Sequence, residues 1–494
     1  MKIHLKHRAD LPTQAELDKI SNLIILLPER DTSAPWPAFP FMKIIRNRLK
    51  ITDSKINSKS AITTDLPNEA GTRTTLSTLR AELTTHELLR LARKHADVHL
   101  AQNPRDVTLI MPGIRQRALR HRAAEAMLAA LLAGAAAMPT CKSAKPGKKR
   151  LRAVTCHGLG DSFDYRRIQA ECAGNSLARE LTALPPNLLT PRLYRQRIRQ
   201  LARQQGWTMR FLNHKALEKE NAGAFLAVAQ GSPDKDAGMV RLSYIPARGK
   251  SRKPLTLVGK GICYDTGGVN LKPARHMHGM HEDMQGSAVA LGALLALSQL
   301  KVPFPVHCWL ALAQNHIGPR AYKQNDVVTA SNGTTIEVMH TDAEGRMVLA
   351  DTLALAARDK PALMIDYATL TGSCVYALGT RYSGAFTNRD SYIPTLIAAG
   401  KHSGERVWPF PLDEDYEEAL ESKIADIKQC TLDGEADHII AARFLQRFAG
   451  KGPWIHIDLA AGNHKGGLGH IPTDYTGFGV RFTLNLLLDQ KIME

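Results

Sequence analysis

Two stretches of the chain gather acidic and basic side chains of the kind that bind metal ions or polarise a substrate. The first, residues 255–283, opens with an apolar run typical of a buried strand and then supplies Lys260, Asp265, Lys272 and Asp283. Glycines after Asp265 let the backbone approach a ligand closely. Carboxylates and lysines at the end of a buried strand are costly unless they are paired or bind something. This stretch therefore predicts a functional site.

The second stretch, residues 340–346, reads HTDAEGR. Asp342 and Glu344 are two residues apart, so in an extended segment both side chains would point the same way. With Asp265 and Asp283 they make four carboxylates, whose charges balance two divalent ions such as Zn, Mn or Mg. Two ions held about 3.5–4 Å apart can share a hydroxide, polarise a carbonyl and stabilise a tetrahedral intermediate. The residues alone therefore predict a two-metal hydrolase, either a peptidase or another kind such as a phosphoesterase.

Four sequence runs, in register and with matching gaps, carry a resemblance to a known family. They are GKGICYDTGGVNLKP (259–273), HEDMQGSAVALG (281–292), HTDAEGRMVLADTL (340–353) and DYATLTGSCVYALG (366–379). Together they resemble the leucine aminopeptidase family, also called leucyl or cytosol aminopeptidases, which are two-metal exopeptidases. The resemblance covers about residues 184–482. It implies an enzyme that releases N-terminal amino acids from peptides and assembles as a homo-hexamer with active sites facing an inner cavity.

Matching the family position by position implies a role for individual residues. The implied metal ligands are Lys260, Asp265, Asp283, Asp342 and Glu344. Lys272 would help to polarise the scissile carbonyl, and Arg346 would hold a bicarbonate that shuttles the proton. The implied contacts to the substrate's N-terminal residue are Met280, Thr369, Leu370 and Gly372.

Elementary chemistry supports these roles but leaves simpler readings open. Only a neutral amine coordinates a metal, so Lys260 needs a pKa lowered by burial and metal charge; otherwise it is a structural lysine paired with a carboxylate. Arg346 lies just before an apolar helix expected over residues 347–358, and an arginine beside a helix N-terminus forms an anion site. Lys272 supplies a positive charge that stabilises negative charge developing on oxygen.

Some residues near the motifs fit no ligand pattern or depart from the family. Three histidines between Lys272 and Asp283 have the spacing of neither a helix face nor a zinc site, and we expect them on the rim of the pocket: His276, His278 and His281. His340 stands where the family usually has asparagine, which affects the expected side-chain preference. Tyr264 and Thr266 replace a common Phe and Ser around the first aspartate without removing a ligand.

The composition of the chain indicates the cellular environment and the partners to expect. Seven scattered cysteines without a CxxC pair suggest reduced thiols in a cytoplasmic protein. The first residues are too polar for a signal peptide, and the longest apolar run, residues 123–138, is too short to span a membrane.

The net charge is +18, and basic residues gather in clusters at residues 115–122, 142–152 and 192–203. These clusters indicate a solvated basic surface or, as an alternative function, DNA binding with or without peptidase activity, although no sequence-reading motif is present. An inactive relative is the remaining alternative.

Alternating strand and helix patterns predict an α/β fold. We expect an N-terminal α/β domain over residues 1–165, a linker helix and Pro-rich break over 166–190, and a catalytic domain over 191–494. The resemblance gives the catalytic domain a mixed central sheet flanked by helices. In the first domain we expect strands at 21–27, 72–77, 106–111 and 151–156, a helix at 115–138 and irregular structure at 29–71. Later strands are expected at 207–212, 240–244, 255–258, 306–312, 362–367 and 454–458. Helices are expected at 163–184, 285–300, 347–358 and 436–448.

Overall fold

The structure is a computed structural model that describes residues 3–29, 39–144, 147, 150–159 and 163–494. Contacts within the chain divide it into two compact units. The first comprises Met1–Cys172 and Lys465–Asp474, and the second comprises Ala173–His464 and Tyr475–Glu494. A short segment near the C-terminus therefore belongs to the first unit, and helix α5 (Tyr165–Thr182) runs across the division between the two.

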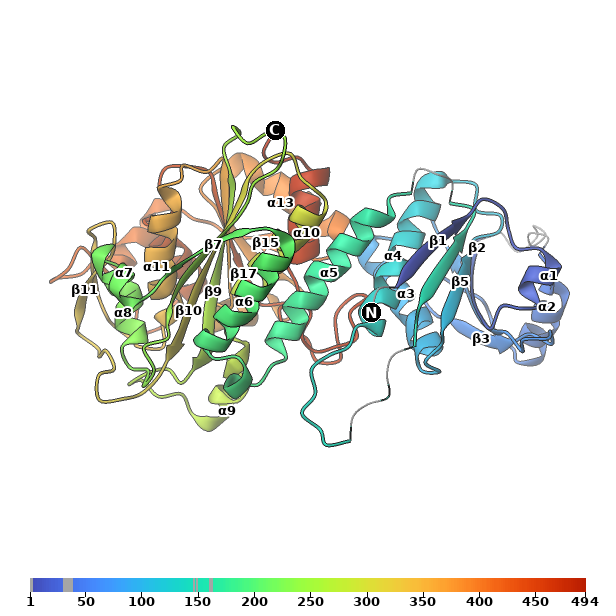
Figure 1. Cartoon of the computed structure of the whole chain (residues 1–494), viewed down its shortest axis with the longest axis horizontal. Helices are drawn as coiled ribbons and strands as arrows, with labels where there is room; N and C mark the ends of the chain where they lie inside the picture. Colours follow the sequence, from blue (N-terminus) through green and yellow to red (C-terminus); the bar gives the residue numbers. More distant parts are fainter. Residues whose placement is uncertain (1–2, 30–38, 145–146, 148–149, 160–162) are drawn as a thin grey trace. The chain divides into compact units, whose positions relative to one another are not determined.

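The first unit is built on a six-stranded sheet with the order β1-β6-β5-β2-β4-β3 (Figure 1). All neighbouring strands are parallel except β3, which pairs antiparallel with β4. The strands are β1 (His4–Arg8), β2 (Asn22–Pro28), β3 (Ile62–Asp65), β4 (Arg73–Leu79), β5 (Asp106–Ile110) and β6 (Ala153–His157).

Strand β2 shows why this sheet carries helices on both faces. Its alternate residues Ile24 and Leu26 pack with the long helices α3 (Thr85–Leu100) and α4 (Arg117–Ala135). Leu23 and Ile25 pack on the other side with α1 (Gln14–Leu17) and α2 (Met42–Ile51). Both faces are thus buried, which explains an uninterrupted apolar run rather than an alternating one.

The predictions for this unit were partly right. The four expected strands are confirmed as β2, β4, β5 and β6, and the expected helix is α4. The prediction of irregular structure over residues 29–71 was wrong in the described part, because α2 and β3 lie there; residues 30–38 lie outside the described part. Strand β1 was missed because its five residues are all polar except Leu5. Helix α3 was missed although Thr84 and Glu87 form a capping box at its start.

The second unit is built on a mixed eight-stranded sheet with the order β15-β14-β17-β13-β9-β10-β8-β7. Its central strands β17, β13, β9 and β10 are parallel. Strands β8 and β14 pair antiparallel with their inner neighbours. The strands are β7 (Thr208–Leu212), β8 (Gly238–Tyr244), β9 (Leu255–Asp265), β10 (Val306–Asn315), β13 (Leu363–Ala368), β14 (Ser383–Thr387), β15 (Val407–Pro409) and β17 (Trp454–Asp458).

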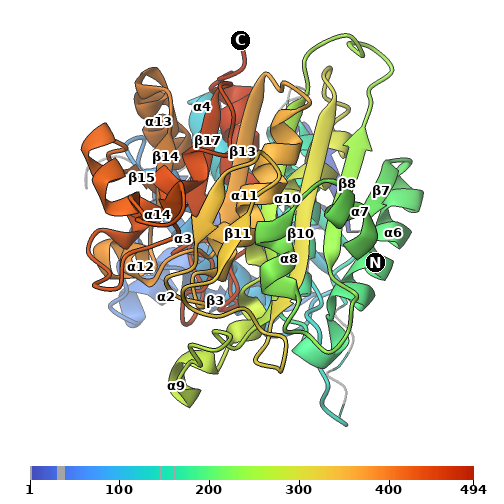
Figure 2. The same ribbon diagram turned by 90° about the vertical axis from the view of Figure 1, so that its left-hand side faces the viewer.

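Helices cover both faces of this sheet. Figure 2 looks at the face covered by α8 (Gly223–Ala229), α11 (Glu344–Ala357) and α14 (Asp437–Gln446), whose buried residues form one core cluster with the sheet. Helices α10 (Gln285–Gln299) and α15 (Val480–Leu484) pack on each other, and α10 packs on β9 and β13. A small second sheet joins β11 (Val327–Thr329), β12 (Thr335–Glu337) and β16 (Ile427–Lys428). The expected α/β class with a mixed sheet flanked by helices is confirmed, as are the expected strands and helices.

Strand β9 is longer than the sequence suggested, and the difference matters for the site. It continues through Lys260 to Asp265 instead of ending at residue 258. The glycines on either side of Lys260 mark close packing against neighbouring elements. A Cβ atom at Gly259 would lie 2.4 Å from the Cα atom of Ser287 on α10. Lys260 is therefore held by a central strand and not by a loop.

Two further observations concern disulfide bonds and membrane-spanning helices. None of the seven cysteines, all in the described part of the chain, forms a disulfide. Within the described ranges, every helix is too short or too polar to cross a membrane.

Candidate metal centre and active site

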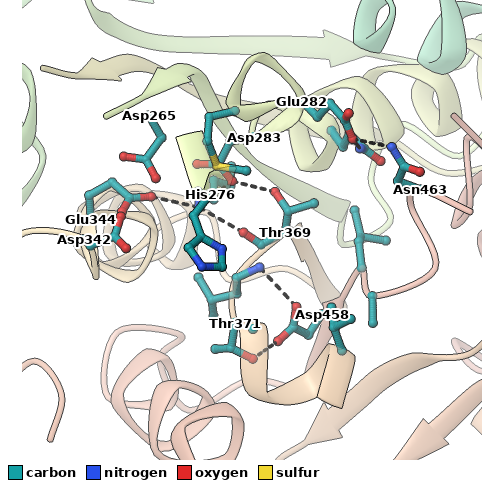
Figure 3. Close-up of a pocket in the computed structure, with 18 of the residues that line it drawn as sticks. Asp265, His276, Glu282, Asp283, Asp342, Glu344, Thr369, Thr371, Asp458 and Asn463 are labelled. Atoms are coloured by element: carbon teal, nitrogen blue, oxygen red, sulfur yellow. Dashed lines mark hydrogen bonds and ion pairs between the residues drawn. The ribbon is translucent and has the colours of Figure 1, made fainter. Parts of the chain in front are cut away.

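A cavity of about 460 Å³ in the second unit brings together nearly all the predicted site residues (Figure 3). Ten of the eleven line it; Arg346 is the one that does not. The ten are Lys260, Asp265, Lys272, Met280, Asp283, Asp342, Glu344, Thr369, Leu370 and Gly372. Residues separated by more than a hundred positions in the sequence therefore share one cavity.

The ends of the parallel strands place these side chains. Asp265 is the last residue of β9, Thr369 follows the last residue of β13, and Asp458 is the last residue of β17. The carboxyl ends of parallel strands meet at one edge of a sheet, which is where α/β folds bind ligands. Asp283 joins them because it links the short 3-10 helix η2 (Met280–Glu282) to α10.

Asp342 and Glu344 reach the cavity in a way that differs from the prediction. The expected extended segment was wrong: Asp342 lies in a turn, and Glu344 is the first residue of α11. Their carboxylates still converge, because oxygen atoms of Asp265, Asp342 and Glu344 all lie within 4.8 Å of one another. Figure 3 shows these three side chains grouped together, with Asp458 across the cavity.

Two lysines lie between the carboxylates. The Lys260 Nζ atom is 2.8 Å from Asp283 Oδ1 and 2.9 Å from Glu344 Oε1. The Lys272 Nζ atom is 2.9 Å from Asp265 Oδ2 and also pairs with Asp342. Each ammonium group thus bridges two carboxylates and balances their charge inside the cavity.

The crowding of charge shifts the pKa values of the site. Burial, and then the neighbouring Glu344 and Asp265 carboxylates, raise the pKa of Asp342 to about 7. Burial also raises the pKa of Asp283 well above its usual range, although the nearby Lys260 opposes this. Burial alone would lower the pKa of Lys260, but the Asp283 and Glu344 carboxylates outweigh it and raise that pKa. The carboxylates therefore need positive charge beside them in order to stay ionised.

The donor set fits divalent cations. The grouped oxygens are hard ligands, and two oxygens bound to one zinc ion lie at most about 4.4 Å apart, twice the usual bond length. The oxygen atoms of Asp265, Asp342 and Glu344 lie within 4.8 Å of one another, so a small movement of these side chains would bring them to this spacing. The Oδ2 atom of Asp283 is buried and has no hydrogen-bond partner among the described residues, so it is available as a ligand.

Other side chains orient the carboxylates and were missed by sequence reasoning. Asn315, the last residue of β10, donates from its Nδ2 atom to Asp265 Oδ1 at 2.9 Å and to the Thr341 carbonyl oxygen at 3.0 Å. The Thr369 hydroxyl donates to Asp283 Oδ1 at 2.7 Å. Such outer contacts fix ligand orientation in metal sites. Asn315 was missed because the expected strand ended at residue 312, before the residue that closes β10.

The predicted substrate contacts form a loop held by a buried aspartate. Asp458 Oδ1 accepts from the Leu370 backbone N–H at 3.1 Å, and Asp458 Oδ2 accepts from the Thr371 hydroxyl at 2.7 Å. Thr369, Leu370 and Gly372 thereby line one wall of the cavity, and Met280 lines it from η2. The sequence gave no indication of the role of Asp458.

The three histidines expected on the rim differ in their placement. His276 lines the cavity, as Figure 3 shows. His278 and His281 do not line it, and the Nε2 atom of His281 is 3.2 Å from the Tyr475 hydroxyl. In the part of the chain that the structure describes, no histidine joins the grouped carboxylates.

Arg346 is buried and does not line the cavity. It is the third residue of α11 and only 3% of its side chain is exposed. Its Nη2 atom is 2.7 Å from Asp437 Oδ1, and its Nη1 atom donates to the Gln429 carbonyl oxygen at 3.0 Å. Burial would lower the pKa of Arg346, but the Asp437 carboxylate outweighs it and raises that pKa. Asp437 is a partner that the sequence did not indicate.

Comparison with known proteins settles the family. Residues 176–484 match the model of the family described as "Cytosol aminopeptidase family, catalytic domain". The chain belongs to this family. Curated relatives include probable cytosol aminopeptidases of Syntrophotalea carbinolica, 43% identical over 64% of this chain, and of Desulfovibrio desulfuricans, 46% identical over 58% of this chain. The matches span 63% and 57% of the length of those two relatives.

A solved structure extends the likeness to nearly the whole chain. A mutant of tomato leucine aminopeptidase superposes with a TM-score of 0.86 at 26% sequence identity. The superposition covers 99% of this chain and 97% of the tomato chain. The structural likeness thus includes the first unit, although the four sequence runs that carry the resemblance all lie in the second unit.

Proposed function

We propose that this protein is a metal-dependent aminopeptidase that releases N-terminal amino acids from peptides. The observation that carries the proposal is the cavity in which carboxylates from β9, α11 and the turn before it converge within 4.8 Å. Membership of the cytosol aminopeptidase family supports the same reaction.

Two divalent ions, Zn or Mn and alternatively Mg, are the cofactors that this set of donors would hold. The ligands would be Lys260, Asp265, Asp283, Asp342 and Glu344. When bound, such ions act as Lewis acids on the scissile carbonyl and lower the pKa of water. Lys260 would coordinate as the neutral amine, because bound cations take over the charge balance that its ammonium group provides between Asp283 and Glu344.

The chain's own residues would bind and orient the peptide. The N-terminal side chain would contact Met280 and Leu370, which line the cavity together with the backbone at Thr369 and Gly372. Lys272 is 14% exposed and faces the cavity, so its ammonium group would stabilise negative charge that develops on the carbonyl oxygen. Removal of one preorganised donor of this kind typically raises the barrier by about 2.7–4 kcal/mol.

Proton transfer requires a further group. By the family resemblance, Arg346 would hold a bicarbonate, and such an anion would supply proton-transfer chemistry beside the cavity. The buried guanidinium and the nearby start of α11 supply positive potential for such an anion.

We also propose that the protein is a cytoplasmic homo-hexamer, an assembly that sedimentation velocity would test.

Substrate and metal panels test the proposal. Metal-stripped protein would be reloaded with Zn, Mn or Mg and assayed against aminoacyl anilides, against the same compounds with a blocked amine, and against phosphate esters. We expect hydrolysis only of anilides with a free amine. Hydrolysis of phosphate esters without hydrolysis of anilides would instead identify a two-metal phosphoesterase.

A further inference from the structure

A pair of polar side chains lies at one end of the cavity, away from the grouped carboxylates. Glu282 and Asn463 both line the cavity, and the Asn463 Nδ2 atom donates to Glu282 Oε2 at 2.8 Å. In the view of Figure 3 this pair stands well apart from Asp265 and Glu344, with Thr369 between them. A peptide whose amine and scissile carbonyl bind at the metal ligands would therefore direct another of its groups toward this end.

The backbone around Asn463 is anchored, so the fold sets the position of this side chain. Asn463 forms an isolated antiparallel bridge with Tyr475, and the Gly462 carbonyl oxygen accepts from the Thr476 N–H at 3.0 Å. A Cβ atom at Gly462 would lie 2.3 Å from Gln285 Oε1, so the chain packs closely against the first residue of α10. The Asn463 amide is thus presented to the cavity by a segment that is held on two sides.

Glu282 determines which way the Asn463 amide is turned. An ionised carboxylate only accepts hydrogen bonds, so the NH₂ group of the amide faces Glu282 and the carbonyl oxygen Oδ1 faces away from it. Among the residues that the structure describes, none donates to this Oδ1 atom. This end of the cavity therefore offers a substrate two kinds of acceptor, an amide oxygen and a carboxylate that is not one of the expected metal ligands.

Apolar side chains line the cavity as well. Met280 lies on the same short helix as Glu282, and Leu370 and Val375 are also in the lining. A substrate side chain that satisfies both kinds of contact has an apolar stem and a donating tip, as lysine and arginine have. An aliphatic side chain would pack on the apolar residues but would desolvate the acceptors without giving them a partner, which is unfavourable.

We propose that Asn463, oriented by Glu282, makes this protein select peptides whose N-terminal residue is lysine or arginine. The inference rests on the aminopeptidase function proposed above and names the substrate class of the same cavity. The stem of the first side chain packs on Met280, and its terminal nitrogen donates to Asn463 Oδ1 and is attracted by the Glu282 carboxylate.

The test compares lysyl and norleucyl anilides, whose side chains have the same carbon chain and differ in the terminal ammonium group. For wild-type protein loaded with Zn or Mn, we expect kcat/KM to be at least about tenfold higher for the lysyl anilide. Asn463→Leu removes the acceptor and should lower this ratio at least about tenfold. Glu282→Gln keeps the shape of the side chain and removes its charge, so it should also lower the ratio, and it serves where Asn463→Leu does not fold.

Two features of the design separate selectivity from a loss of structure. A ratio of two substrates measured on one sample does not depend on the fraction of the protein that is folded or loaded with metal. Asn187→Leu makes the same exchange at an exposed position outside the cavity lining, and it should keep the wild-type ratio.

The outcomes distinguish this inference from the proposed function. A wild-type ratio below about tenfold, or a ratio that neither Asn463→Leu nor Glu282→Gln lowers, would overturn the selectivity alone, since the anilides would still be hydrolysed. A wild-type protein that hydrolyses no anilide with any of the metals would overturn the proposed function, and this inference with it.

Discussion

The ammonium nitrogen of Lys260 lies 2.8 Å from a carboxylate oxygen of Asp283, with both side chains almost completely buried. A second carboxylate, that of Glu344, lies 2.9 Å from the same nitrogen. A buried lysine with two acidic partners compensates their charge when no cation is present, and we propose that it becomes a ligand when cations bind. The same residue is thus expected to matter for folding in one state and for metal binding in the other.

The first prediction concerns Lys260→Met. Without metals the variant leaves Asp283 and Glu344 without their buried cation, and removal of one partner of such a pair typically costs about 3–5 kcal/mol. With metals bound, the ions supply the missing charge and the loss should be much smaller. Chemical unfolding of both proteins, with chelator and with added Zn or Mn, measures this difference. Lys401→Met, at an exposed lysine, serves as the control. An equal loss in both conditions would contradict the dual role.

The second prediction concerns Glu344→Ala. The variant removes one of three carboxylates grouped within 4.8 Å, and we expect at least a hundredfold loss of turnover, in line with about 2.7–4 kcal/mol for a preorganised charge. Turnover and bound metal per chain should fall together. Glu414→Ala, an exposed glutamate, should change neither quantity. If Glu344→Ala turned over substrate at the wild-type rate, the site would have been assigned wrongly.

The third prediction concerns Asn315→Ala. The amide of Asn315 donates to Asp265 Oδ1 at 2.9 Å, so its loss removes one of the contacts that orient that carboxylate, beside those of Gly267 and Lys272. Side chains that orient metal ligands in this way typically contribute about 10–100-fold to metal affinity. Competition with a chelating dye would measure the affinity directly. Unchanged affinity in a variant with a normal circular dichroism spectrum would show that Asp265 does not depend on this contact.

Local patterns in the sequence were enough to single out the acidic and basic residues of the two stretches, and the family resemblance added the expected substrate contacts. The runs that contain Asp265, Asp342 and Glu344 are short and combine glycine, acidic and basic residues in a way that indicates chemistry. The alternation of strands and helices could also be predicted, because apolar runs such as residues 255–258 stand between more polar segments.

Pairings between distant residues could not be predicted in this way. Arg346 and Asp437 are 91 positions apart, and neither one's surroundings point to the other. Asn315 and Asp458 act at the ends of strands whose neighbours are set by the order of the sheet, which the pattern of one chain does not reveal. The length of β9 was misjudged for a related reason: glycine at 259 serves the approach of α10, a contact invisible in the sequence.

Two buried histidines of the first unit set up a further prediction. His95 and His99, on α3, have their Nδ1 and Nε2 atoms 2.7 Å and 2.9 Å, respectively, from the Thr75 hydroxyl. Ser77 is a further partner of His95 at 2.7 Å, and Asn22 of His99 at 3.0 Å. Burial, followed by the nearby His99, lowers the pKa of His95 to about 3, and burial, followed by Arg73, lowers the pKa of His99 to about 4. Both side chains are therefore neutral in the folded protein.

The fourth prediction follows from the sign of these shifts. The unfolded chain binds protons at both histidines below pH 6.5 whereas the folded unit does not, so stability falls as the pH drops from 6.5 toward 4. At pH 5 the loss should be about 2 kcal/mol per histidine. Hydrogen exchange of the β2 and β4 amides, corrected for the intrinsic pH dependence, would measure it. His95→Gln or His99→Gln should remove about half of the effect, whereas His4→Gln, at an exposed strand position, should leave it intact. Equal protection of these strands at pH 5 and 7 would show that the two histidines are not buried in their neutral form.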